Sequence, residues 1–77
     1  MTSTHEPGRP SWRCLACGAD WPCPTRRAEL VADSGGSRVA LALRMARYFS
    51  EAVDDRPDVS VEVLYDRLLA WVRAPRT

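Results

Sequence analysis

Four residue types are missing from this 77-residue chain: lysine, asparagine, glutamine and isoleucine. Most of their codons are rich in A and T, so their joint absence indicates a coding bias toward G and C. This codon bias explains why all 11 basic side chains are arginine, so the use of arginine alone is no sign of selection for phosphate binding. The net charge of +1 agrees with this, because nucleic-acid-binding domains are usually strongly basic.

Long apolar runs are missing too. Residues 2–7 are polar, so Met1 is not followed by the apolar core of a signal peptide. No segment approaches the about 20 apolar residues that a transmembrane helix needs. The three cysteines are an odd number, which does not suit a framework of disulfide bonds. We therefore expect a cytoplasmic protein with reduced thiols.

The chain is short for a domain that folds on its hydrophobic core alone. A domain of this size buries only about 60% of the surface that its unfolded chain exposes, and small domains often need a disulfide or a metal as a staple. We expect a single domain over residues 1–77, with a zinc-binding knuckle over 1–23 and three helices over 24–77.

Metal-ligand chemistry is concentrated between His5 and Cys23. Cys14 and Cys17 form a Cys-x-x-Cys pair, and Cys23 follows after five more residues. Such a pair can close two thiolates on one ion when the turn between them is made of small residues, as Ala16, Gly18 and Ala19 are. Three thiolates need a fourth ligand for a closed tetrahedral zinc site. His5 is the natural candidate, and Asp20, a partner residue or water are the alternatives.

Neighbouring residues fit the same site. Pro7, Gly8 and Pro10 favour a chain that doubles back between His5 and Cys14. Cys23 directly precedes a predicted helix, where the positive end of the helix dipole favours a thiolate. We expect Trp12 and Trp21 to cover the site and restrict water, as outer-shell groups do; stacking on nucleic-acid bases is their alternative role.

Enzymatic and redox roles are poorly supported. A catalytic zinc needs an open ligand position and a nearby general base, and neither Glu6 nor Asp20 stands in a known zinc-enzyme motif. A redox Cys-x-x-Cys needs a buried strand before it, and residues 10–13 do not resemble one.

Helical periodicity begins after the cysteines. Pro24 suits a first helical position, and residues 25–33 predict a short helix that ends at Gly35 and Gly36. Ser37 can cap a second helix that runs to about Val53, and Asp58 or Ser60 can cap a third that reaches about Ala74 before Pro75. The second helix has two adjacent apolar stripes: Val39, Ala42, Leu43, Ala46, Phe49 and Val53, and then Leu41, Met45, Tyr48 and Ala52. Such width predicts cover on two sides, by neighbouring helices or by another subunit.

Charge is unevenly distributed. Up to Arg47 there are seven arginines and four acids, and from Tyr48 onward there are six acids and four arginines. The arginines that could meet a partner or phosphate are Arg26, Arg27, Arg44 and Arg47, with Arg38 beside them. We find no helix-turn-helix signature to support nucleic-acid binding, and the acidic half would repel a phosphate backbone.

The N-terminal motif resembles one found in a group of small actinobacterial proteins. It contains Trp12-x-Cys14-x-x-Cys17-Gly18-x-x-Trp21-Pro22-Cys23, and the likeness extends no further than about Leu30. Some of those proteins are described as flavin reductases, but a chain this short cannot hold a flavin-binding barrel. The cysteine spacing is also similar to that of WhiB-like regulators, which hold a four-iron cluster; this chain has His5 where they need a cysteine. Zinc-binding anti-sigma factors, too, combine a histidine with Cys-x-x-Cys beside helices.

The sequence thus predicts a small, mostly α-helical protein whose zinc knuckle is held by His5, Cys14, Cys17 and Cys23. We expect a non-enzymatic protein-interaction or regulatory accessory module, with another protein or a second copy as its partner. A nucleic-acid-associated transcriptional regulator and a WhiB-like iron–sulfur redox sensor are the alternatives.

Overall fold

The computed structural model describes residues 4–73, in which helices follow an irregular N-terminal segment. The helices are α1 (Pro24–Asp33), α2 (Arg38–Asp55), α3 (Val61–Leu68) and a short 3-10 helix, η1 (Ala70–Arg73). The segment before α1 has two isolated antiparallel bridges, and residues 4–73 contain no β-strand. The predicted class, a mostly helical protein with an N-terminal knuckle, is confirmed.

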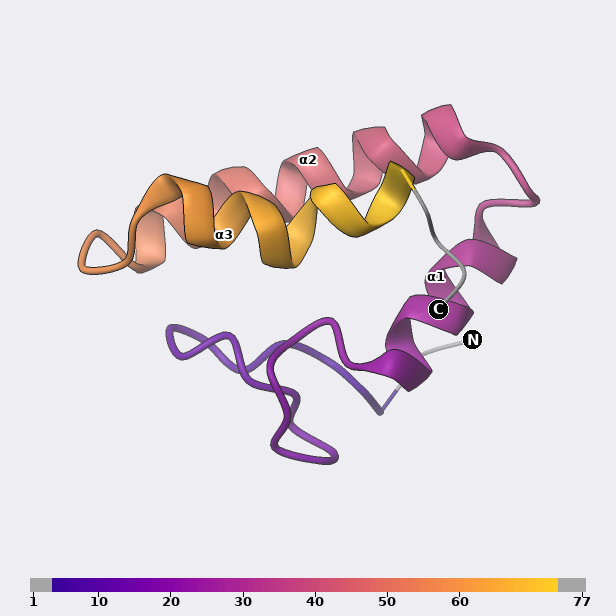
Figure 1. Ribbon diagram of the computed structural model, residues 1–77. Helices are drawn as coiled ribbons and strands as arrows, with labels where there is room; N and C mark the ends of the chain where they lie inside the picture. The colour runs from indigo at the N-terminus through magenta and orange to yellow at the C-terminus, as the bar shows by residue number, and fades with distance from the viewer. Residues whose placement is uncertain (1–3, 74–77) are drawn as a thin grey trace.

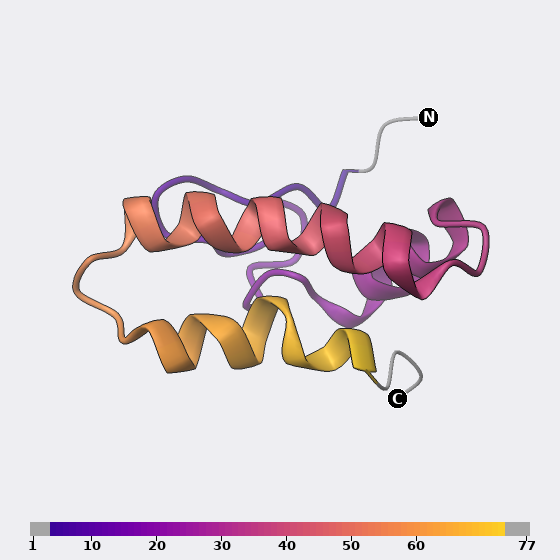
Figure 2. The ribbon, with the colours of Figure 1, turned by 90° about the horizontal axis from the view of Figure 1, so that it is seen from above.

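α2 and α3 pack side by side and run in opposite directions (Figure 1). The N-terminal segment lies beneath this helical pair in Figure 1, and α1 leads from it to the loop before α2. In the view from above, Figure 2 shows α2 and α3 in full, with the N-terminal segment behind them. The helical pair is therefore covered by the N-terminal segment on one side only.

Helix starts follow the sequence closely. Pro24 occupies the first turn of α1 directly after Cys23. The hydroxyl of Ser37 accepts a hydrogen bond from the Ala40 N–H at 3.1 Å, and the hydroxyl of Ser60 accepts one from the Val63 N–H at 3.2 Å. Each serine thereby satisfies a backbone donor that the helix itself leaves free.

Helix ends were predicted less well. α2 continues past the expected Val53 to Asp55. The third helix is not continuous to the expected Ala74: α3 ends at Leu68, and the chain tightens into η1. The tighter turn brings both Trp71 and Val72 into the core, where they are 7% and 4% exposed. The expected stop at Ala74 and Pro75 lies outside the described residues.

The two apolar stripes on α2 are buried to different degrees, and Ala42, Phe49 and Val53 of the first stripe are only partly buried against the core. Leu41, Met45 and Ala52 of the second stripe are almost completely buried, whereas Val39 and Leu43 of the first stripe are 70% and 69% exposed. The expected cover on two sides is present over part of the helix: Tyr48 packs on Trp21 and Phe49 packs on Tyr65 of α3, and the exposed part of the first stripe includes Val39 and Leu43. The buried stripe belongs to a single core cluster with residues from every other part of the fold, among them Leu30, Leu64, Leu68, Trp12 and Trp21.

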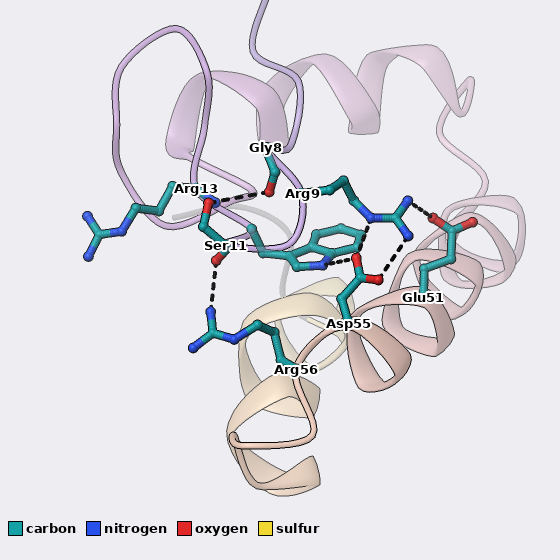
Figure 3. Close-up of polar contacts among 8 residues, drawn as sticks. Gly8, Arg9, Ser11, Arg13, Glu51, Asp55 and Arg56 are labelled. Atoms are coloured by element: carbon teal, nitrogen blue, oxygen red, sulfur yellow. Dashed lines mark hydrogen bonds and ion pairs between the residues drawn. The ribbon is translucent and has the colours of Figure 1, made fainter.

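A charged contact holds the N-terminal segment against the end of α2 (Figure 3). The guanidinium of Arg9 donates to the carboxylate of Asp55 through two nitrogens and to Glu51 at 3.1 Å. The indole N–H of Trp12 donates to the same Asp55 carboxylate at 2.9 Å. The hydrogen bond from Arg9 lowers the pKa of Asp55 below its ordinary value against the opposing effect of burial, and the bond from Trp12 adds to the lowering.

Two further arginines reach across to backbone carbonyls of the N-terminal segment. Arg56, just after α2, donates to the carbonyl of Ser11 at 3.0 Å (Figure 3). Arg67 of α3 donates to the carbonyl of Trp12 at 2.7 Å and, over a longer distance, to that of Trp21. The Trp12 carbonyl also accepts from the Trp21 N–H at 3.1 Å, so Arg67 adds a second donor there, while Arg56 supplies a donor to the Ser11 carbonyl in irregular backbone.

Replacing Asp55 with asparagine should lower the melting temperature, because Arg9 and Trp12 then lose their ionised acceptor. The stability that ionised Asp55 contributes is complete above its unfolded pKa, about 3.9, and is lost as the pH falls through the lowered folded value. Asp55→Asn and the wild type should therefore differ at neutral pH and begin to converge below about pH 4. Thermal melts followed by circular dichroism measure this. Asp54→Asn, at the exposed neighbour, is the control; equal effects of the two variants would contradict the assignment.

Candidate metal centre

The backbone between His5 and Cys14 doubles back, as the prolines and glycine of this stretch predict. Pro7 forms an antiparallel bridge with Cys14, and the Leu15 N–H donates to the carbonyl of Glu6 at 2.9 Å. Gly8 lies in the bend, where an added Cβ would come within 3.1 Å of the Arg13 carbonyl oxygen. This close approach explains why glycine is needed at that position.

A second turn presents the Cys-x-x-Cys pair. The N–H of Gly18 donates to the carbonyl of Cys14 at 2.8 Å, and the Cys14 N–H donates to the carbonyl of Ala19 at 2.7 Å. Gly18 has φ +76°, a left-handed conformation that side chains disfavour. The tip of this turn is exposed to solvent, while Cys14 and Cys23 are buried.

These two turns bring His5, Cys14, Cys17 and Cys23 together. Their ligand atoms all lie within 4.8 Å of one another, and the three cysteines form no disulfide. The Nδ1 atom of His5 lies 3.2 Å from the Cys14 sulfur and 3.3 Å from the Cys23 sulfur, and the two sulfurs are 3.9 Å apart. The structure thus gathers the four predicted ligands, with His5 in the fourth position.

The spacing of the ligand atoms fits one tetrahedral metal ion. With bonds of about 2.3 Å to sulfur and about 2.0 Å to nitrogen, the edges of a zinc tetrahedron are about 3.8 Å between sulfurs and about 3.5 Å between sulfur and nitrogen. The distances around Cys14 and Cys23 agree with these edges to within a few tenths of an ångström. With Cys17 as the fourth ligand, one zinc ion would have its coordination shell filled by protein and no position left for a substrate.

The turn also stabilises the ionised form of one ligand. Burial of the Cys14 sulfur acts to raise its pKa, but hydrogen bonds from the backbone N–H groups of Cys17 and Ala16, with smaller contributions from the Cys17 and His5 side chains, lower that pKa to about 6. The Ala19 N–H acts to lower the pKa of Cys17, yet that pKa is raised, because Cys14, desolvation and Cys23 favour its thiol form. Three sulfurs this close cannot all carry a charge comfortably without a cation among them.

Cys23 connects the centre directly to α1. It is the capping residue of that helix, and its carbonyl accepts the first helical hydrogen bond, from the Arg27 N–H at 2.9 Å. Its sulfur is 3.9 Å from that of Cys14, so one residue is both a candidate ligand and the start of the helix. Cys23 therefore directly precedes the first helix, as the position of Pro24 predicted.

Both predicted covering tryptophans are buried. Trp21 is fully buried, and its indole N–H donates to the backbone carbonyl of His5 at 2.8 Å, which fixes the histidine's position. Trp12 is 1% exposed and packs against Trp21 with ring centroids 5.8 Å apart. Tyr48 of α2 completes this aromatic cluster, 4.7 Å from Trp21. Indoles buried in this way offer no free face on which a base could stack.

The four arginines considered for phosphate contact fall into two pairs. Arg26 is 6% exposed and pairs with Glu29 within α1. Arg27 donates to the carbonyl of Pro22 at 3.1 Å and lies over the Trp71 ring at 5.4 Å. These two side chains are part of the fold. Arg44 and Arg47 are exposed on α2.

Sequence reasoning missed the residues that attach the centre to the helices. Arg9, Asp55 and Arg67 carry these contacts, and each looked like an ordinary surface charge. No local signal marks them, because their partners lie more than 40 positions away along the chain.

Comparison with known protein families, characterised proteins and solved structures finds no match. Among residues 4–73, no helix combines the length and the apolar character needed to cross a membrane. The function is therefore inferred from the metal centre and the surface.

Acidification should weaken this centre in a defined range. In the metal-free chain, the stabilisation from the Cys14 thiolate is complete above the ordinary thiol pKa of about 8.5. It is lost as the pH falls through about 6. Metal affinity should fall over the same range, because ligands must be deprotonated to bind. Zinc titrations at a series of pH values measure this, and Cys14→Ser should both weaken binding and flatten its pH dependence. A zinc affinity that did not change with pH between about 5 and 8 would refute the prediction that ionised thiols bind the metal.

Proposed function

We propose that this protein is a non-enzymatic, zinc-stabilised interaction module, in which the metal builds the fold and the helices present the binding surface. The closed set of four ligand atoms within 4.8 Å carries the proposal. A structural zinc site is four-coordinate, whereas a catalytic one keeps a position open. Zinc bound here would contribute directly to the free energy of folding, as it does in other small zinc-dependent domains.

Zinc is preferred over an iron–sulfur cluster because of the ligand spacing. In a four-iron cluster each ligand binds a different iron, and four cysteines are usual. Here one ligand is a histidine, and the Cys14 and Cys23 sulfurs are separated by 3.9 Å, about one edge of a tetrahedron around a single ion.

The surface that supports an interaction role includes the side of α2 that faces away from its buried residues Leu41 and Met45. Val39 and Leu43 are 70% and 69% exposed, although the core beneath them is complete. On α3, Val61 and Tyr65 are also exposed, and Tyr65 lies edge-on against Phe49 of α2. Exposed apolar side chains on both helices support a surface that binds protein.

Nucleic-acid binding has less support. Arg44 and Arg47 are exposed one helical turn apart, but Arg26 and Arg27 are engaged within the fold. The chain's net charge of +1 gives little attraction to a phosphate backbone.

The zinc proposal is tested by metal content and by folding together. The purified chain should contain one zinc per chain and no iron, and removal of the metal by a strong chelator should cause loss of helical signal and a lower melting temperature. Anaerobic purification followed by elemental analysis and circular dichroism gives both readings. A brown protein with iron, or unchanged melting after complete metal removal, would overturn the proposal.

Single ligand variants separate the metal from general stability. Cys14→Ser should lose most of the bound zinc and much of the helical signal, whereas Ala16→Ser, in the same turn but without a ligand atom, should retain both. Zinc content and melting temperature are measured on each. If the two variants behaved alike, Cys14 would not be a ligand.

A further inference from the structure

The four candidate ligands differ in how easily solvent reaches them. Cys14 and Cys23 are only 3% and 1% exposed and His5 is partly buried, whereas Cys17 is exposed. Every residue from 15 to 20 is exposed, and this knuckle tip points away from α2 and α3 in Figure 1. Cys17 is therefore the ligand that a dissolved reactant meets first.

The surroundings of the knuckle tip are open. A Cβ added at Gly18 would meet no atom within 4 Å, and the side chain of Leu15 is 71% exposed. Small dissolved molecules therefore have free access to this turn, although the other two sulfurs of the centre lie within 4.8 Å of the Cys17 sulfur.

Cys14 is the sulfur best placed to react with an oxidised Cys17. The Gly18 N–H donates to the Cys14 carbonyl at 2.8 Å, which closes a single helical turn around the Cys-x-x-Cys pair. Cα atoms three positions apart in such a turn are about 5 Å from one another. A disulfide spans Cα separations of about 4.4–6.8 Å, so this pair can be bridged without movement of α1, which begins after Cys23.

We propose that Cys17 is an oxidant-reactive site, at which hydrogen peroxide converts the Cys14–Cys17 pair into a disulfide and thereby releases the metal. This inference rests on the proposed zinc module and adds its regulation. Thiolates are the form of cysteine that both binds metal and reacts with oxidants, whereas a disulfide sulfur is no longer a thiolate ligand. The pair is thus a target of the oxidant and not a catalyst of disulfide exchange.

The reaction takes two steps. The Cys17 thiolate attacks one oxygen of hydrogen peroxide, the O–O bond breaks, and the hydroxide that leaves takes up a proton from solvent; the product is a sulfenic acid. The Cys14 thiolate then attacks the Cys17 sulfur, forms the S–S bond and expels the sulfenic oxygen as hydroxide, which also takes up a proton. The two sulfurs together lose two electrons, and one peroxide is reduced to two molecules of water.

The reaction removes half of the coordination shell. His5 and Cys23 remain as donors, but a structural zinc site needs four. The contact of the Trp12 indole with Asp55 and that of Arg67 with the Trp12 carbonyl use no ligand side chain, so the reaction leaves them intact. Oxidation should therefore remove the metal's contribution to stability, and a dithiol reductant with added zinc should restore it.

The test treats the zinc-loaded protein, purified without oxygen, with hydrogen peroxide. A chromogenic zinc chelator reports the released metal, and mass spectrometry after alkylation of free thiols reports the cysteines. Cleavage after arginine gives one peptide, residues 14–26, that holds all three cysteines and no methionine. We expect one zinc released for each disulfide formed, with the alkyl label on Cys23 alone. The melting temperature should fall and should recover with dithiothreitol and zinc.

Cys17→His tests whether this thiol is the point of attack. Imidazole is also a zinc ligand, so the variant keeps four donors but has no thiol at the exposed position. It should bind zinc and release it to peroxide about tenfold more slowly than the wild type, because the accessible thiolate is gone. Leu15→Ser is the matched control: it changes another exposed residue of the knuckle tip, removes no sulfur and should release zinc at the wild-type rate.

The outcomes separate this inference from the function on which it rests. A chain purified without zinc overturns both. A zinc-containing protein that keeps its metal and its three thiols in peroxide overturns the oxidant-reactive site and leaves the zinc module standing. A disulfide between any other pair of cysteines, or zinc release from Cys17→His at the wild-type rate, overturns the assignment of Cys17. If Cys17→His holds no zinc, the peptide masses of the wild type decide.

Discussion

Three cysteine sulfurs and one histidine nitrogen meet within 4.8 Å, and the conformation of the whole segment before α1 depends on this meeting. The segment has no regular secondary structure that could hold it through a repeating set of backbone hydrogen bonds. Thiolates at this separation repel one another, so all three sulfurs can be ionised together only with a cation at the centre. The knuckle turn favours cation binding in advance, because its backbone N–H groups donate to the Cys14 sulfur and lower the pKa of that thiol to about 6.

A second set of contacts makes the irregular segment part of the domain. Trp12 adopts a left-handed backbone conformation with φ +60°, which costs roughly 1–2 kcal/mol for a residue with a side chain. Its carbonyl accepts from Arg67, its indole donates to Asp55, and its ring packs on Trp21. These interactions offset the strain and fix the segment to two helices at once. A metal ion held by the four ligands would set the local shape, and the tryptophans and charges set the position of the segment on the helices.

The sequence was informative where the causes are local. Cysteine spacing, Pro24 after Cys23, and the serines before two helices act over a few residues, and the structure has all of them where they were predicted. It was much less informative where the cause lies far along the chain. Periodicity showed that α2 has two apolar stripes but not how far each one is buried, because that depends on where the N-terminal segment and α3 pack. The same holds for Asp55, whose role is visible only once Arg9 and Trp12 lie beside it.

The absence of any linker between Cys23 and α1 gives the centre a mechanical role. Because Cys23 is both a candidate ligand and the residue before Pro24, the orientation of the sulfur fixes the rotational phase of the helix. One inserted residue at this junction would rotate α1 by about 100° relative to the centre, at about 3.6 residues per turn. Leu30 would then turn away from the core and polar residues would turn toward it. The length of this junction, as much as the identity of its residues, is therefore under constraint.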